Sequence, residues 1–88
     1  MAKIEIRPQG GGRFRARVSE GGSETTHDVT VSTQDLGRLG AGYPSPDAFV
    51  RACFEFLLAR EPKESILRSF DVSVISRYFP EFEREITG

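Results

Sequence analysis

The first third of this 88-residue chain alternates between apolar and polar residues, whereas the rest repeats apolar residues at helical spacing. Alternation with a period of two is typical of a strand that buries one face. Short glycine-containing connections at residues 8–12 and 21–23 separate the alternating stretches and favour antiparallel neighbours. We therefore expect a three-stranded antiparallel β-meander over residues 1–31. Its apolar face is expected to consist of Ile4, Ile6, Phe14, Ala16, Val18, Val29 and Val31.

The longest apolar segment, residues 45–61, predicts the central helix around which the core is built. Ser45 is a good N-cap and Pro46 suits the first helical position, while Pro62 stops the helix. We expect this helix to run from about Pro46 to Arg60. One broad arc of it is apolar and is expected to be buried against its neighbours: Phe49, Val50, Cys53, Phe54, Phe56 and Leu57.

Shorter helices are expected on both sides of the central one. Residues 32–35 resemble a capping box and predict a short helix closed by Gly40. After Pro62 we expect helical pieces over Glu64–Phe70, after Asp71, and around Phe82 and Ile86. The predicted fold is one α+β domain over residues 1–88. It comprises the meander (1–31), a short helix and the central helix (32–61), and short C-terminal helices (62–88).

Composition narrows the classes of protein that fit. The hydrophobic fraction of 38% and charged fraction of 28% are ordinary for a globular domain, and the net charge of −1 argues against a general polyanion binder. No apolar run is long enough for a bilayer span, and the N-terminal residues lack the apolar core of a signal peptide. We expect a cytoplasmic protein that does not contact membranes.

The candidate chemistry is sparse. His27 is the only histidine and Cys53 the only cysteine, which excludes an internal disulfide and a multi-cysteine zinc site. His27 lies at the margin of the expected core face, and Cys53 lies on the apolar arc, so a dyad between them would need tertiary contact. Gly10–Gly12 joins two strands and predicts a turn, not a phosphate loop. We expect no enzymatic activity, no cofactor and no metal.

Arg13, Arg15 and Arg17 project from one face of one expected strand, about 6.6–7 Å apart, a spacing close to that of a nucleic-acid backbone. They could contact phosphates or pair across strands with Glu5, Glu24 and Asp28. The overall balance of charge favours pairing. Residues 70–78 resemble a helix-turn-helix weakly, because Pro80 truncates the second helix and glutamates follow it.

The segments REPKESIL (residues 60–67) and RYFPEF (77–82) are similar to the C-terminal half of a family of small uncharacterised bacterial proteins. The meander and the segment HDVTV (27–31) extend this resemblance over nearly the whole chain. It implies a stand-alone bacterial protein with no assigned activity and no catalytic residues. In layout alone, the chain also resembles small meander-plus-helix antitoxins of the HicB type, although its C-terminal helical part is longer.

A dense mixed-charge corner surrounds Pro62, and aromatic residues follow it in short helices that have few means of burying them. Aromatic side chains rimmed by charge are common in protein-contact surfaces, although the simpler interpretation is that these residues close the core. Leu58 falls on the polar face of the central helix, with Asp47, Arg51 and Glu55. It is either a scattered exposed leucine or an extension of the contact surface. The candidate partner-binding residues are Leu58, Arg60, Glu61, Lys63, Glu64, Tyr78, Phe79 and Phe82.

The expected function is therefore a non-enzymatic interaction or regulatory module. Its partner is an unknown protein or a second copy of the chain. The alternative is a nucleic-acid-binding or HicB-antitoxin-like regulator that uses Arg13, Arg15 and Arg17.

Overall fold

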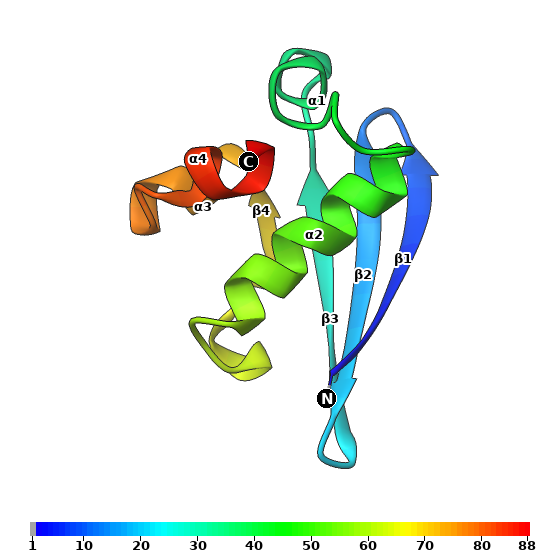
Figure 1. The fold of residues 1–88 in the computed structure, drawn as a ribbon. Coiled ribbons are helices and arrows are strands. Elements are labelled where there is room, and N and C mark those ends of the chain that lie inside the picture. The colour runs from blue at the N-terminus through cyan, green and yellow to red at the C-terminus, as the bar shows by residue number, and fades with distance from the viewer. Residues whose placement is uncertain (1) are drawn as a thin grey trace.

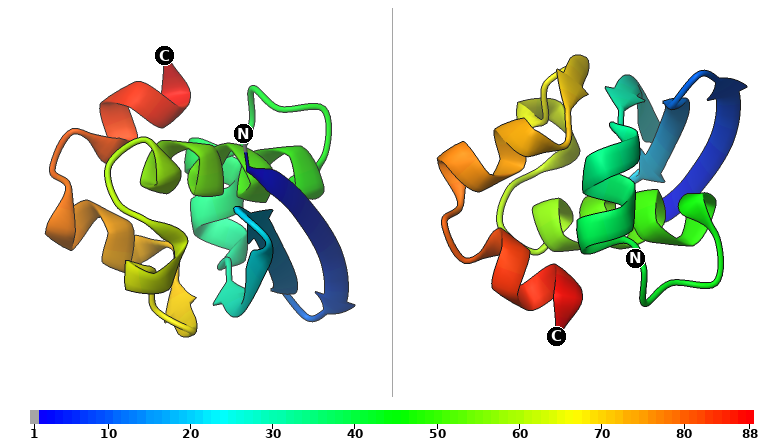
Figure 2. Two further views of the ribbon diagram at one scale, coloured as in Figure 1. Left: turned by 90° about the horizontal axis from the view of Figure 1, so that it is seen from below. Right: turned by 90° about the horizontal axis from the view of Figure 1, so that it is seen from above.

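The computed structural model describes residues 2–88 and shows a four-stranded sheet with one long helix lying across one of its faces (Figures 1 and 2). The strands are β1 (Lys3–Gly10), β2 (Arg13–Glu20), β3 (Ser23–Thr30) and β4 (Ser69–Asp71). The α-helices are α1 (Thr33–Leu39), α2 (Pro46–Leu58), α3 (Ser73–Tyr78) and α4 (Phe82–Thr87), and a 3-10 turn, η1, spans Lys63–Ser65. The α+β class is as predicted.

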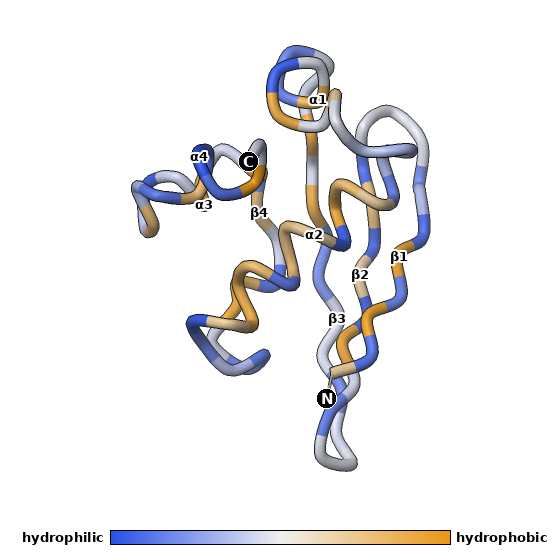
Figure 3. Tube along the Cα trace, in the orientation of Figure 1, coloured by the Kyte–Doolittle hydropathy of each residue, from blue (hydrophilic) through white to orange (hydrophobic). Residues whose placement is uncertain are grey.

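The predicted meander is present. β1, β2 and β3 pair antiparallel, with Ile6 opposite Ala16 and Phe14 opposite Val29. Their inward side chains are buried as expected, apart from Ile6, which is partly buried at the edge. Figure 3 shows hydrophobic and hydrophilic positions alternating along β1 and β2.

The prediction of a helix over Glu64–Phe70 is wrong. After η1 the chain becomes extended, and β4 joins the sheet parallel to β3, with Val29 opposite Phe70. The far edge of β3 explains this outcome, because its backbone groups need partners. The N–H of Asp28 donates to Arg68 O at 2.7 Å, and the N–H of Val72 donates to Thr30 O at 3.0 Å. A helix over these residues would leave that edge unpaired.

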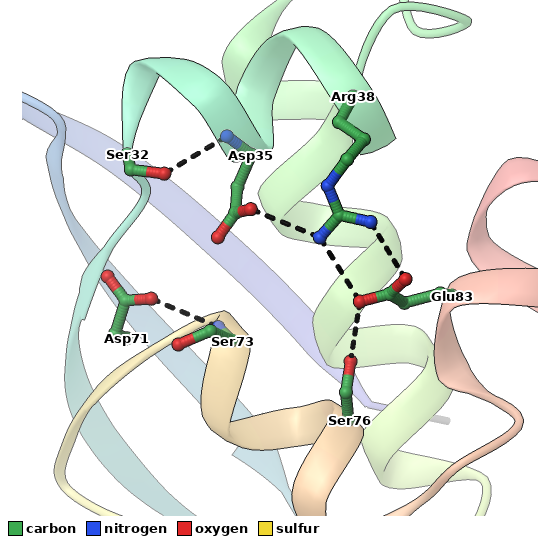
Figure 4. Close-up of polar contacts among 7 residues, drawn as sticks. All are labelled: Ser32, Asp35, Arg38, Asp71, Ser73, Ser76 and Glu83. Atoms are coloured by element: carbon green, nitrogen blue, oxygen red, sulfur yellow. Dashed lines mark hydrogen bonds and ion pairs between the residues drawn. The ribbon is translucent and has the colours of Figure 1, made fainter.

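The central helix forms as predicted but ends two residues early. The Ser45 hydroxyl accepts a hydrogen bond from Ala48 N at 3.1 Å, Pro46 occupies the first turn, and the helix ends at Leu58. All six residues of the predicted apolar arc are buried. The short helix α1 is capped as predicted, because the Ser32 hydroxyl accepts from Asp35 N at 3.0 Å (Figure 4).

The C-terminal helices cover the flank of α2 that the sheet leaves open. Phe82 is fully buried, and its ring centroid lies 5.0 Å from that of Phe56 in an edge-to-face contact. The ring of Phe79 meets Phe56 from another side at 5.8 Å. No helix of residues 2–88 is both long and apolar enough to cross a bilayer.

Candidate functional site

An apolar groove of about 200 Å³ opens between the C-terminal end of α2, the segment from η1 to β4, and α3. Its walls include the side chains of Leu57, Ile66, Leu67, Phe70, Val74 and Tyr78. Glu61 is the only charged residue lining the groove. A concave apolar surface with few polar groups is the usual form of a binding site.

Two large side chains on this groove remain in water. Leu67 is 48% exposed and Tyr78 is 67% exposed, and they are the exposed large hydrophobic residues of the described part of the chain. They come from two different segments, Leu67 from the segment before β4 and Tyr78 from the end of α3. Deeper lining residues such as Leu57 and Ile75 are buried, so the groove has a packed floor and an open apolar rim.

His27 holds the first wall in place. It is 1% exposed, and its Nδ1 donates to the carbonyl oxygen of Leu67 at 2.7 Å, because a carbonyl can only accept. Its Nε2 is 2.8 Å from the Thr25 hydroxyl, and its ring lies 5.4 Å from that of Phe54. Nδ1 therefore fixes the backbone from which the Leu67 side chain projects, and the Thr25 hydroxyl holds the other side of the ring.

Asp71 sets the start of the second wall. Its carboxylate accepts from the Thr30 hydroxyl at 2.7 Å. It also accepts from the N–H of Ser73, the first residue of α3, at 3.0 Å (Figure 4). Partial burial opposes ionisation, but these hydrogen bonds outweigh it and lower the pKa of Asp71. This side chain fixes the direction in which α3 leaves β4, and so the position of Val74 and Tyr78.

Glu83 ties the second wall to the rest of the fold. Its carboxylate accepts two bonds from the Arg38 guanidinium, at 2.8 and 3.1 Å, and one from the Ser76 hydroxyl at 3.2 Å (Figure 4). These contacts connect α4 to α1 and to α3. The Arg38 hydrogen bonds lower the pKa of Glu83. A groove held by fixed walls loses little conformational entropy when it is filled.

The groove unites three of the residues proposed from the sequence, Glu61, Tyr78 and Phe79. The expected surface needs correction at Phe82, which is fully buried, and at Lys63, which is 6% exposed and bonded to Glu64 Oε2 at 2.8 Å. Phe82 was placed on the surface because short helices were expected to leave aromatic side chains uncovered, whereas it packs on Phe56 of α2. Lys63 was placed there as part of the mixed-charge corner around Pro62, whereas η1 packs against β3.

Arg60 and Leu58 also lie outside the groove lining. The Arg60 guanidinium carbon is 3.6 Å from the centroid of the Phe56 ring, and it forms ion pairs with Glu81 at 3.1 Å and Glu85 at 2.9 Å. These contacts fasten α4 to the end of α2, which is a structural role. Leu58 is partly buried against the core.

Leu67, Phe70 and Val74 were not identified as site residues from the sequence. The helix expected over 64–70 assigned Ile66, Leu67 and Phe70 together to the core. The available signal was the adjacent pair Ile66–Leu67, since an extended chain points neighbouring side chains in opposite directions. Ile66 is buried and Leu67 is exposed, as that geometry requires.

The face of the sheet opposite α2 carries the arginines. Arg15 pairs with Asp28 at 3.2 Å and Arg17 with Glu5 at 3.5 Å, so two of the expected cross-strand pairs form. The register also places Arg7 directly opposite Arg15. Like charges in that position repel. A shallow hollow of about 30 Å³ lies on this face, lined by residues of β1, β2 and β3.

Cys53 is buried, and burial raises the pKa of its thiol to about 12, so the thiol stays protonated at neutral pH. Within residues 2–88, no three side chains of His, Cys, Asp or Glu are grouped as metal ligands would be.

Comparison of the chain with protein-family models, with curated proteins and with solved structures found no match.

Proposed function

We propose that this protein is a non-enzymatic interaction module that binds a short apolar segment of a partner protein in the groove between α2, β4 and α3. The observation that carries the proposal is the position of Leu67 and Tyr78. Of the residues described, these are the large hydrophobic side chains left exposed, and both line one groove. Exposed apolar surface gathered at one concave place is typical of a contact site.

The size of the groove defines its occupant. Sites for cofactor-sized molecules measure about 300–1,000 Å³, and a stable interface between two folded proteins buries about 800 Å² on each side. A groove of about 200 Å³ is too small to hold a cofactor-sized molecule, and it covers too little surface to be the whole interface between two folded proteins. It fits one or two bulky side chains presented by a short segment.

Charge adds a second requirement. Glu61 lines the groove and takes part in none of the ion pairs formed within residues 2–88. A carboxylate beside an apolar pocket favours a cation next to the inserted side chain. The occupant we propose is a peptide segment with a bulky aliphatic or aromatic residue close to a lysine or arginine.

The experiment is a selection of displayed random twelve-residue peptides on the folded protein, followed by affinity measurements on variants. Leu67→Ser and Tyr78→Ser should each weaken the selected peptides at least tenfold, because each removes rim contacts. Gln34→Ser, an exposed change on α1, is the matched control and should leave affinity unchanged. The proposal would be refuted if the selected peptides bound all three variants as tightly as the unchanged protein, or if the selection yielded no binding peptide.

A second candidate function is binding of a polyanion on the outer face of the sheet. The observation in its favour is the opposition of Arg7 and Arg15, which a phosphate between them would relieve. The ion pairs of Arg15 and Arg17 count against it. Binding of a single-stranded oligonucleotide that weakens with salt and with Arg7→Gln would support this function. Absent or salt-independent binding would remove it.

A further inference from the structure

The two edges of the sheet differ in how well their backbone groups are covered. The N–H of Val31 donates to Gly12 O, and hydrogen-bonded pairs alternate along the two strands from that point. The backbone N–H and C=O groups of Phe14, Ala16 and Val18 therefore face β3, and those of the arginines between them face β1. The backbone groups of Glu5 and Arg7 therefore face β2, and those of Ile4, Ile6 and Pro8 face outward.

The outer edge of β1 is covered in part. Arg51 of α2 donates to the carbonyl oxygen of Ile4, and Pro8 has no N–H to offer. Ile6 alone keeps both backbone groups on that edge. Proline and a covering side chain are recognised ways to prevent a strand edge from pairing with another chain.

The outer edge of β4 has no such cover. Arg68 and Val72 bond to β3, and Phe70 lies opposite Val29, so residues 68, 70 and 72 face β3. The N–H and C=O groups of Ser69 and Asp71 then point away from the sheet. Neither residue takes part in the backbone hydrogen bonds that form outside the helices and strands within residues 2–88.

This open edge adjoins the groove. Figures 1 and 2 place β3 and α3 on opposite sides of β4, so the free edge of β4 faces the side on which α3 lies. Leu67 and Phe70, on either side of Ser69, both line the groove, and so does Val74, three residues after Asp71. Backbone donors and acceptors therefore lie beside an apolar pocket.

We propose that the partner segment binds as an extended strand, pairing with the N–H and C=O groups of Ser69 and Asp71 while one of its side chains enters the groove. The inference rests on the proposed function and names the conformation of its ligand. Added strands gain affinity from main-chain hydrogen bonds and specificity from alternate side chains. The peptide residue opposite Phe70 points its side chain to the same face of the sheet as Phe70, and so into the groove.

The charge of Glu61 and the limited length of the edge favour a short segment of a partner over a second copy of this chain. Two outward residues offer four backbone hydrogen-bonding groups, enough to orient a peptide of three or four residues. Sedimentation that shows a concentration-dependent dimer, with unlabelled protein displacing the peptide, would overturn this choice of occupant.

The test uses one of the peptides selected as described above, with each backbone nitrogen methylated in turn. A strand directs alternate amides toward its neighbour, so methylation should weaken binding at least tenfold at every second position and be tolerated between. On the protein, the amides of Ser69 and Asp71 should exchange at least tenfold more slowly with peptide bound. The amide of Ile6, outward on the other edge, is the control and should not change.

The two proposals fail differently. A peptide that depends on Leu67 and Tyr78 but shows no alternation in the methylation scan would overturn strand pairing and keep the groove. The same conclusion would follow if Ser69 and Asp71 gained no protection. A peptide that ignores Leu67 and Tyr78 would refute the proposed function and the strand inference together.

Discussion

Replacement of His27 with leucine tests how the sheet positions the groove. The imidazole is buried between β3 and the segment before β4, where it joins the Thr25 hydroxyl to the Leu67 carbonyl. Leucine is similar enough in size to avoid a large cavity. The substitution therefore removes two hydrogen bonds and one ring contact while it keeps an apolar side chain in the core.

The expected loss follows from those contacts. A buried acceptor without a donor costs about 1–3 kcal/mol, and the Leu67 carbonyl is only partly buried, so the lower half of that range applies. The contact between His27 and Phe54, at 5.4 Å between centroids, contributes about 0.5–1.5 kcal/mol. The Thr25 hydroxyl is partly exposed and can bond to water. We expect His27→Leu to lower the free energy of unfolding by about 2–3 kcal/mol, a large share of the roughly 5–10 kcal/mol typical of such a domain.

Urea unfolding followed by circular dichroism measures this loss. Thr26→Val is the matched control, because Thr26 is exposed on the same strand and lies outside the hydrogen bonds of His27, so the change should cost less than about 1 kcal/mol. Equal stability of the two variants would refute the structural role assigned to His27. At a temperature where both variants are folded, only His27→Leu should also weaken peptides bound in the groove, because only it releases the Leu67 backbone.

Three further predictions concern the core and its ion pairs. Phe56→Ala should lower the free energy of unfolding by about 3–5 kcal/mol in the same urea assay, because it leaves a cavity between the rings of Phe79 and Phe82. Cys53, with its pKa raised to about 12, should react with an aromatic disulfide reagent only as fast as the protein unfolds; rapid reaction of the native protein would contradict its burial. The pKa of Glu83 lies below its usual value of 4.5 in the folded protein, so its contribution to stability is complete above about pH 4.5 and is lost as the pH falls through the folded pKa. Acid unfolding curves for Glu83→Gln should therefore fall less steeply below pH 4.5 than those of the wild type, and parallel curves would count against the Arg38 contact.

The sequence was sufficient to predict the meander and the central helix because local signals agreed with the final packing. Alternation set the inward face of the strands, and Ser45, Pro46 and Pro62 marked the ends of the helix. The difference of two residues at the end of α2 is within the usual uncertainty of helix boundaries. The Ser32 cap of α1 was also predicted from the sequence, and the N–H of Asp35 donates to its hydroxyl in the structure.

The fourth strand was not predictable from its own residues. Ser69–Asp71 has three residues, too few to show a period, and Ile66 and Phe70 stand four apart, as on a helix. Its conformation is decided by tertiary contact with the open edge of β3, which local propensity does not include. His27 was expected at the margin of the core for the same reason, because the Leu67 carbonyl that satisfies it comes from forty residues away.

The candidate site depends on this long-range contact. With a helix over 64–70, the unpaired edge would be that of β3, and the chain would have neither the outer edge of β4 nor the rims of Leu67 and Tyr78. The parallel pairing of β4 with β3 creates both, because it turns Leu67 outward, fixes Asp71 to start α3, and leaves the outer groups of a new edge strand unpaired. On the opposite edge Pro8 lacks an N–H and Arg51 bonds to the Ile4 carbonyl, so that edge has some cover. The four outward backbone groups of Ser69 and Asp71, placed beside an apolar groove, are therefore a stronger argument for binding at β4 than the groove alone.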